Sequence, residues 1–331
     1  MNRSKRIITT TGLLALVVSL HVSCGGNVDE SGESRPSRVF LSTGTAPPGG
    51  AFFVVGSALS EVINEFGGEY GFSVTAEATS GSQENIRRLI SGELDFALSN
   101  AAITYFAVRG ESGWDRPFPV RTIMTLAPNV ALFVTPADSG VQTLTELRDK
   151  RVTVGPAGAG FEYFVGPLLN AHGLTYDDFS PLNATQQGAV DMITDGSADA
   201  AFLGGAVPTA SITQAAASME ISFLPYGESE KEQLTNEFVF FRNATIPAET
   251  YRGQSEAFEG LDVGSMHFIA AENADEELVY QVTRILYENR ERVVEKHAAG
   301  RAINPNNVIR DTGTEFHPGA IRFYREIGIW P

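Results

Sequence analysis

Short apolar segments alternate with segments of helical periodicity along the first hundred or so residues. Residues 38–44 form an apolar run that ends in glycine, and in 51–66 the apolar side chains recur at helical spacing. Residues 71–79 and 94–100 repeat the strand pattern, with an amphipathic segment at 83–93 between them. Strands that alternate with helices predict a parallel sheet that is flanked by helices.

The same order returns in the middle of the chain. Residues 151–205 begin as strand, glycine loop and helix, and they end as a helix followed by a strand. In each cycle an aspartate follows a glycine by three positions and precedes an apolar strand, as in Gly92/Asp95 and Gly196/Asp199. An aspartate between a helix and a strand usually caps backbone amides. The echo predicts two similar lobes rather than one continuous sheet.

The last third of the chain is predicted to be mostly helical. Residues 275–297 form a long amphipathic pattern, and 317–330 close the chain with a second one. Apolar segments near 129–135 and 264–270 are candidates for the connections between lobes. We therefore expect an α/β fold with two lobes, each a mostly parallel sheet flanked by helices.

The predicted organisation has four parts. They are a signal peptide at 1–23, a flexible Gly/Ser/acid-rich tether at 24–37, a first lobe made of 38–129 and 271–331, and a second lobe at 130–270.

The extreme N-terminus has the pattern of an export signal. Basic residues at positions 3, 5 and 6 precede the apolar run 11–20, which is too short to span a bilayer. Cys24, the single cysteine of the chain, follows directly, as the lipidated cysteine of a lipoprotein signal does. We expect an exported, periplasmic protein that is anchored to a membrane through Cys24. Ordinary signal cleavage beside an incidental cysteine is the alternative.

Composition and charge narrow the classes of function. The chain of 331 residues is 43% hydrophobic and 19% charged, as soluble globular proteins are, and its net charge is −16. Such an acidic balance argues against nucleic acid or an anionic membrane surface as partner. The five histidines are scattered and no Gly-x-Ser-x-Gly elbow occurs. We therefore expect no catalysis, no metal and no cofactor.

Glycine-rich loops follow the first strand of each cycle. Each lies between a strand and a helix, where free backbone N–H groups and the helix dipole converge. The first loop has the glycine spacing of a phosphate-binding loop but lacks its lysine, which suits a carboxylate better than a triphosphate. Gly44, Gly49, Gly158 and Gly160 could instead only permit tight turns. Two such loops, one in each lobe, favour a ligand in a cleft between the lobes.

Six motifs occur in the order and spacing of one known family. They lie at 43–53, 78–85, 91–95, 146–155, 246–254 and 317–320. On these motifs the chain resembles, over nearly the whole mature sequence, the TAXI subgroup of solute-binding proteins, the extracytoplasmic receptors of TRAP transporters.

The resemblance implies a fold and a function. The expected fold is the two-lobed periplasmic-binding-protein fold, type II-like, which closes on a ligand. The expected protein is a monomer that captures a small carboxylate and delivers it to TRAP transporter membrane subunits, which are driven by an ion gradient. The alternative is a substrate-binding lipoprotein of an ABC importer or sensor, and an exported enzyme on the same fold is a further one.

Positions that match the family motifs give the candidate substrate-binding residues. These are Thr45, Phe52, Phe53, Thr79, Ser82, Asn85, Ser99, Asn100, Gly158, Ala159, Gly160 and Phe161. Thr79 and Ser82 could equally cap the following helix, and the two phenylalanines could belong to the core. Where the family offers Tyr-Tyr and Ser-Gly-Thr, this chain has Phe52-Phe53 and Ala159-Gly160-Phe161. We therefore expect a more apolar pocket, which prefers a monocarboxylate with an apolar body.

Overall fold

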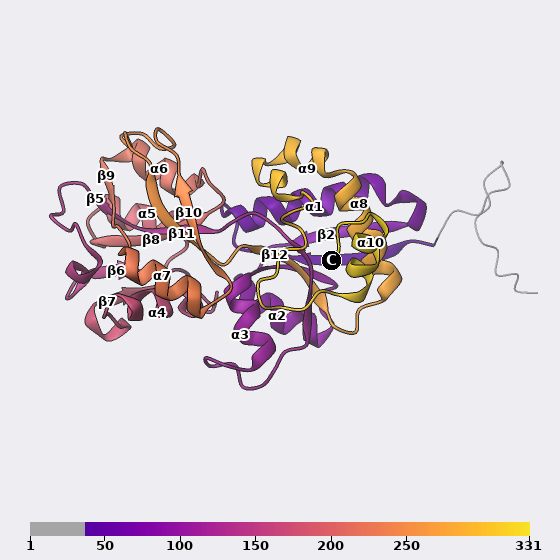
Figure 1. Ribbon diagram of the computed structural model, residues 1–331. Coiled ribbons are helices and arrows are strands. Elements are labelled where there is room, and N and C mark those ends of the chain that lie inside the picture. The colour runs from indigo at the N-terminus through magenta and orange to yellow at the C-terminus, as the bar shows by residue number, and fades with distance from the viewer. Residues whose placement is uncertain (1–36) are drawn as a thin grey trace, which may run out of the picture. The chain divides into compact units, whose positions relative to one another are not determined.

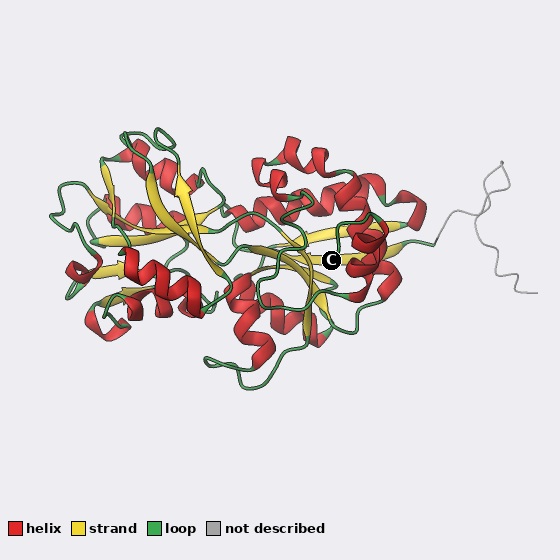
Figure 2. Ribbon diagram, in the orientation of Figure 1, coloured by secondary structure: helices red, strands yellow, loops and turns green. Residues whose placement is uncertain are grey.

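Two mixed β-sheets, each flanked by helices, make up the part of the chain that the structure describes (Figures 1 and 2). The computed structural model describes residues 37–331, and Arg38–Pro331 form one compact unit. The predicted signal peptide, Cys24 and all but the last residue of the predicted tether lie outside the described residues. This architecture confirms the predicted fold class.

The first sheet has five strands in the order β2-β1-β3-β12-β4. β1 is parallel to both β2 and β3, whereas β12 runs antiparallel to its neighbours β3 and β4. Each parallel strand leads into a helix of the same number. The bounds are β1 Val39–Gly44, α1 Ala51–Phe66, β2 Phe72–Glu77, α2 Ser82–Ser91, β3 Phe96–Asn100, α3 Ala101–Arg109, β4 Val120–Thr125 and β12 Met266–Ala271.

The second sheet has seven strands, in the order β10-β11-β5-β8-β6-β7 with β9 paired to β5. Two of its strand pairs are parallel, β6 with β7 and β6 with β8, and the other pairs are antiparallel. The strand bounds are β5 Val130–Pro136, β6 Arg151–Thr153, β7 Ser180–Leu182, β8 Ala200–Gly205, β9 Ile221–Phe223, β10 Phe241–Ile246 and β11 Phe258–Val263. The helices are α4 Glu162–Ala171, α5 Gln186–Thr194, α6 Ala210–Ser218 and α7 Glu228–Glu237.

Both sheets are mixed, although the alternation of strands and helices predicted mostly parallel ones. The βα cycles do pair in parallel, but β5 and β12 lie antiparallel to the strands beside them. The chain leaves the first sheet between β4 and β5, at residues 126–129, and returns between β11 and β12, at 264–265. Of the apolar segments that were predicted to connect the lobes, most of each is therefore a strand. The predicted lobe boundaries stay a prediction.

Two aspartates hold the corresponding strands of the two cycles in the same way. Asp95 Oδ2 accepts a hydrogen bond from Ser42 N at 2.8 Å, and Asp199 Oδ2 accepts one from Arg151 N at 2.8 Å. Asp95 comes directly before β3, and Asp199 comes directly before β8. Each accepts its hydrogen bond from the adjacent parallel strand. The predicted backbone-capping role and the echo between the cycles are both present in the structure.

The C-terminal part is helical, as predicted, but its long helix is interrupted. α8 (Glu276–Glu288) ends and α9 (Arg290–Lys296) begins at Asn289, whose Nδ2 donates to the carbonyl of Ile285 at 2.9 Å. Asparagine side chains compete with backbone hydrogen bonds and so favour helix ends. The remaining elements are α10 Pro318–Glu326 and the short 3-10 helices Gly68–Tyr70, Leu144–Leu147, Tyr176–Asp178 and Ala298–Ala302 (η4).

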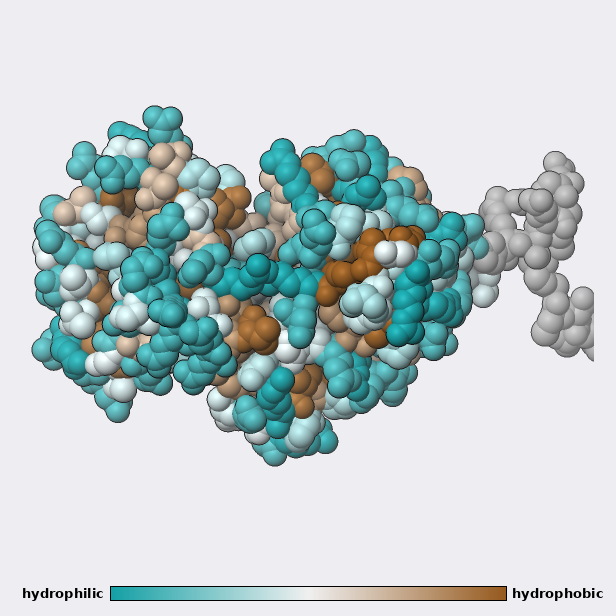
Figure 3. Space-filling model, viewed as in Figure 1, coloured by the Kyte–Doolittle hydropathy of each residue, from teal (hydrophilic) through white to brown (hydrophobic). Residues whose placement is uncertain are grey.

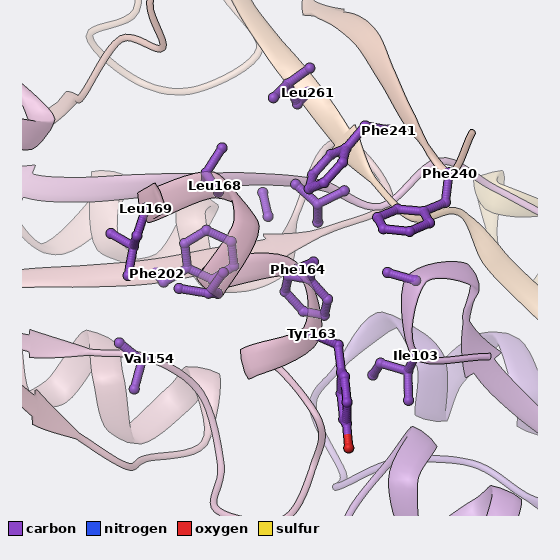
Figure 4. Close-up of a cluster of buried hydrophobic side chains, with 14 of the residues drawn as sticks. Ile103, Val154, Tyr163, Phe164, Leu168, Leu169, Phe202, Phe240, Phe241 and Leu261 are labelled. Atoms are coloured by element: carbon purple, nitrogen blue, oxygen red, sulfur yellow. The ribbon is translucent and has the colours of Figure 1, made fainter. Parts of the chain in front are cut away.

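We call the five-stranded sheet with its helices the first half of the unit, and the seven-stranded sheet with its helices the second half. One hydrophobic cluster runs through both halves. It joins α3 of the first half to α4 of the second, where the rings of Phe106 and Tyr163 lie 5.9 Å apart between centroids. Figure 4 shows Ile103 beside Tyr163 and Phe164 in this cluster. Each sheet has a further cluster of its own under its helices. None of the helices formed by residues 37–331 has the length and apolar run needed to cross a membrane.

Candidate ligand-binding cavity

A cavity of about 120 Å³ lies where the loops of both sheets meet. Most of its lining comes from or follows six strands, β1, β2 and β3 of the first sheet and β6, β7 and β8 of the second, and the chain around the start of β5 adds Asn129 and Ala131. In open α/β sheets, ligands bind beyond the carboxyl ends of the parallel strands. The cavity occupies this position for both sheets at once.

Several helices begin at the wall of this cavity. The first residues of α1, α2 and α6, namely Ala51, Ser82 and Ala210, all line it. The residues that precede them, Gly50, Gly81 and Thr209, make no side-chain capping hydrogen bond. The first N–H groups of a helix have no partner inside the helix. Three sets of free amides and three positive dipole ends therefore lie at one cavity.

No charged side chain of the described residues lines the cavity. Its polar side chains are Ser80, Ser82, Asn100, Asn129, Thr185, Gln186, Gln187, Ser211 and Gln214. Among residues 37–331, no group of three His, Cys, Asp or Glu side chains is placed to hold a metal ion. Any attraction for an anion therefore comes from backbone amides and neutral side chains, since the wall supplies no lysine or arginine.

Aromatic side chains form the opposite wall. Phe161, Phe164 and Phe202 line the cavity from the second half, with ring centroids 5.1 Å apart for the first pair and 5.9 Å apart for Phe164 and Phe202. Figure 4 shows Phe164 and Phe202 within the same cluster of side chains, with their rings tilted to one another. A Cβ on Gly155 would lie 2.1 Å from the ring of Phe161, so only glycine leaves room for this ring. The wall suits an apolar ligand surface.

Five of the twelve sequence-predicted residues line the cavity, and the structure brings them together from both halves. They are Phe52, Ser82, Asn100, Ala159 and Phe161. The seven that lie outside the lining are Thr45, Phe53, Thr79, Asn85, Ser99, Gly158 and Gly160.

Three of the residues outside the lining hold the first loop from behind. Thr45 Oγ1 donates to the carbonyl of Glu77 at 2.6 Å, and Thr79 Oγ1 donates to the carbonyl of Thr45 at 3.1 Å. Asn85 Nδ2 donates to the carbonyls of Thr45, at 2.7 Å, and Leu98, at 2.8 Å. All three side chains are buried. They position the backbone that presents the amides, so that their own donors do not reach the cavity.

Ser82 and Asn100 combine lining and positioning. Ser82 Oγ accepts a hydrogen bond from Asn100 N at 3.0 Å. Asn100 caps α3 by accepting from Ala102 N, and its Nδ2 donates to the carbonyl of Gly264 at 2.7 Å. Asn100 thus ties the α3 terminus to the second crossing of the chain. The capping alternative for Thr79 and Ser82 is not met, because α2 begins after Gly81 with no side-chain capping hydrogen bond.

The two glycines of the second loop have different roles. Gly160, at φ +92°, lies against α3, because a Cβ there would be 2.9 Å from Cδ1 of Ile103. Gly158, at φ +73°, has open space beside it and so only permits the turn. The halves also meet through Gln83 Nε2, which donates to Tyr163 Oη at 3.1 Å. Burial raises the pKa of Tyr163, so this phenol stays protonated.

The prediction from the sequence did not include the part of the cavity wall that α5 and α6 supply, with Gln186 and Ser211. Gln186 Nε2 donates to the carbonyl of Gly204 at 2.6 Å, and its Oε1 accepts from Ser211 Oγ at 2.6 Å. These residues join α5, β8 and α6 at the cavity wall. A usable signal was present, because Thr185 caps α5 directly after a strand, accepting from Gly188 N. It marks a further βα connection, equivalent to the two glycine loops.

Comparison with known proteins gives a family and a fold. The model of the NMT1-like family matches residues 43–328. A solved protein from Bordetella bronchiseptica RB50 is 12% identical over 87% of this chain and 89% of its own, with a TM-score of 0.53. At this identity the likeness is one of fold, and it agrees with the two helix-flanked sheets described above.

Two further similar structures have descriptive names. The periplasmic aliphatic sulphonate-binding protein SsuA from Escherichia coli is 12% identical over 89% of this chain and 80% of its own, with a TM-score of 0.45. The ligand-binding component of an ABC-type import system from Staphylococcus aureus is 10% identical over 78% of each chain, with a TM-score of 0.48. The family match covers most of the sequence, and the chain belongs to the NMT1-like family.

Proposed function

We propose that this chain is an extracytoplasmic solute receptor that binds a small organic anion in the cavity between its sheets. The observation that carries the proposal is the convergence of the uncapped first turns of α1, α2 and α6 on a cavity without charged side chains. Helix N-termini bind anions through free amides and the dipole. We propose a receptor rather than an enzyme; among residues 37–331, the side chains that line the cavity are apolar or polar and uncharged.

The ligand is a monoanion with an apolar body. The positive ends of three helix dipoles, with no lysine or arginine beside them, suit a ligand with one carboxylate better than a ligand with two. Phe161, Phe164 and Phe202 then cover the rest of the molecule. The cavity, at about 120 Å³, is similar to the apolar cavities of about 150 Å³ that hold benzene. A branched 2-oxo acid or a small aromatic acid has this size and polarity.

Delivery to a membrane importer completes the proposed function. The first candidate importer is of the ABC type, the class named for the Staphylococcus aureus protein. The second is the TRAP type, which the order of the motifs in the sequence implies. Uptake of the solute by cells distinguishes them, because the first needs ATP and the second an ion gradient. In either case, Cys24 would anchor the receptor to the membrane as a lipoprotein.

Proline substitution at the first residue of a helix tests the amide site directly. Proline is tolerated at this position, where it removes one N–H without breaking a helical hydrogen bond. Gly50 and Thr209 have extended backbones, which suits a following proline. In Ala51→Pro and Ala210→Pro we expect the Kd for 3-methyl-2-oxobutanoate to rise about tenfold, because each loses a hydrogen bond to a charged group.

Titration calorimetry measures the effect, with Glu228→Pro as the matched control. That variant makes the same backbone change at the first residue of α7, which does not line the cavity. Its Kd should equal that of the parent protein. Benzoate and an alkanesulphonate should also bind, and glutamate should bind more weakly. If glutamate binds more tightly than all of these, or if both proline variants bind normally, the proposed site is wrong.

A further inference from the structure

A second hollow of about 620 Å³ lies at the crossings between the sheets, lined by residues different from those of the ligand cavity. Its wall comes from both halves of the unit. β10 and the two residues after β8 contribute from the second half, and η4 with the segment up to Arg310 contributes from the C-terminal part. We call it the arginine groove. Its volume is in the range of pockets that hold small molecules rather than of flat docking surfaces.

Three arginines line the groove in a protein whose net charge is −16. They are Arg242, Arg301 and Arg310, with Asp262 as the one acidic residue among the lining residues. The side chains of Arg242 and Arg301 are exposed and form no ion pair among the residues that the structure describes. The groove therefore has an excess of positive charge, unlike the chain as a whole.

Arg310 is fixed in the groove wall. Its Nε donates to Asn307 Oδ1 at 3.2 Å, and its Nη2 donates to Ser265 Oγ and lies 3.8 Å from Asp262 Oδ2. Its Nη1 is buried without a hydrogen-bond partner among the described residues. Burial and the nearby Arg242 lower the pKa of Arg310, whereas Asp262 raises it. The guanidinium groups of Arg242 and Arg310 carry like charges in the same groove, and an anion bound there would offset their repulsion.

The groove and the ligand cavity share one segment of chain. Over residues 128–131, at the end of the first crossing and the start of β5, Asn129 and Ala131 line the cavity, whereas Pro128 and Val130 line the groove, as does the preceding Ala127. Successive side chains of an extended chain point to opposite sides. An anion that binds Arg242 of β10 and Arg301 of η4 would thus bridge the two halves at the crossing, on the side away from the cavity.

We propose that the arginine groove is a binding site for a small oxyanion with two or more negative charges, a phosphate-type anion or a polycarboxylate. Arginine is suited to both, because its planar guanidinium binds phosphate and carboxylate oxygens in pairs. The site is separate from the solute site and does not depend on the identity of the solute. It accepts the multivalent anions that the uncharged cavity does not suit.

Titration of the full chain with pyrophosphate and with citrate at low ionic strength tests the groove. We expect both Kd values to be submillimolar in the parent protein, and to rise about tenfold in Arg242→Gln and in Arg301→Gln. Both side chains are exposed, so circular dichroism should show unchanged folding. The control Arg325→Gln makes the same charge change on α10, outside the groove, and should leave both Kd values within twofold.

The two probes separate the sources of the anion. Tighter binding of pyrophosphate would assign the groove to a phosphate-type ligand, and tighter binding of citrate to a polycarboxylate. The proposal is overturned if neither anion binds at millimolar concentration, or if the two groove variants bind as the control does. Binding of an acidic peptide alone, without either small anion, would also overturn it and make the groove a protein-docking surface.

Discussion

The two halves of the molecule each use one side-chain amide to hold the backbone beside the ligand cavity, but in different surroundings. In the first half, Asn85 is fully buried and donates to two carbonyls, those of Thr45 and Leu98. In the second half, Gln186 is only half-buried, lines the cavity itself, and bonds to both backbone groups of Gly204. The first amide lies behind the wall, whereas the second is part of the wall.

This difference teaches which half supplies which property. The first half presents the backbone amides of α1 and α2. Their positions are fixed by a buried layer of hydrogen-bonded side chains, which we call the dry layer and which consists of Thr45, Thr79 and Asn85. The second half presents the amides of α6 and, in addition, the side chains of the aromatic wall and of Gln186 directly to the cavity. Changes in the dry layer should therefore affect folding, whereas changes in the second half should affect the ligand. The predictions below test this division.

The largest expected effect on stability follows from removing the buried side-chain amide of Asn85. Asn85→Ala leaves the carbonyls of Thr45 and Leu98 without this donor inside the protein. The carbonyl of Thr45 keeps the bond from Thr79 Oγ1, so it loses one hydrogen bond, worth about 1 kcal/mol, whereas the loss at Leu98 costs about 1–3 kcal/mol. We therefore expect the free energy of unfolding to fall by about 2–4 kcal/mol. Urea denaturation followed by circular dichroism measures it. A loss below 1 kcal/mol would show that the layer is not dry, and the division between the halves would fail.

A smaller effect is expected from acid, and it should begin in the first half. His267 of β12 is fully buried, and burial, with the charge of Arg310, lowers its pKa to about 3. Its ordinary pKa is about 6.5, so the unfolded chain binds the proton more tightly between these values. Stability is complete above pH 6.5 and is lost as the pH falls toward 3, by about 2 kcal/mol at pH 5 from this group.

The variant His267→Asn separates this effect from that of other groups. Burial raises the pKa of the neighbouring Asp262, which acts in the opposite sense and is present in both proteins. The difference in unfolding free energy between parent and variant should therefore shrink by about 2 kcal/mol from pH 7 to pH 5. Hydrogen exchange at pH 5 should show the first sheet opening before the second. Equal opening of both sheets would contradict the comparison.

The smallest effect on stability is expected for the wall amide. Gln186→Ala removes bonds to Gly204 and Ser211, but water in the cavity can replace them. We expect a loss of about 1 kcal/mol in unfolding free energy, the net value of an ordinary hydrogen bond. The Kd for 3-methyl-2-oxobutanoate should nevertheless change severalfold, because the residue lines the cavity. A large loss of stability with unchanged binding would reverse the roles of the two amides.

Local patterns in the sequence were sufficient to predict the βα cycles, because helical and strand periodicity is a property of neighbouring residues. The directions of β5 and β12 were not predictable in this way, since each pairs with strands distant in the sequence. The same limit applies to the site. Thr45 was expected at the ligand, but its hydroxyl bonds to Glu77, which lies 32 positions away in the sequence. Spacing alone does not show whether a polar side chain faces the ligand or another part of the backbone.

The alternation of side chains at 128–131 constrains how this protein can change in evolution. A single insertion or deletion there would exchange the residues that face the cavity with those that face the arginine groove. Both hollows would be altered by one event, even with every residue type kept. Substitutions can adjust each hollow separately, so diversification should proceed by replacement here. Length variation should be confined to exposed loops that serve neither hollow.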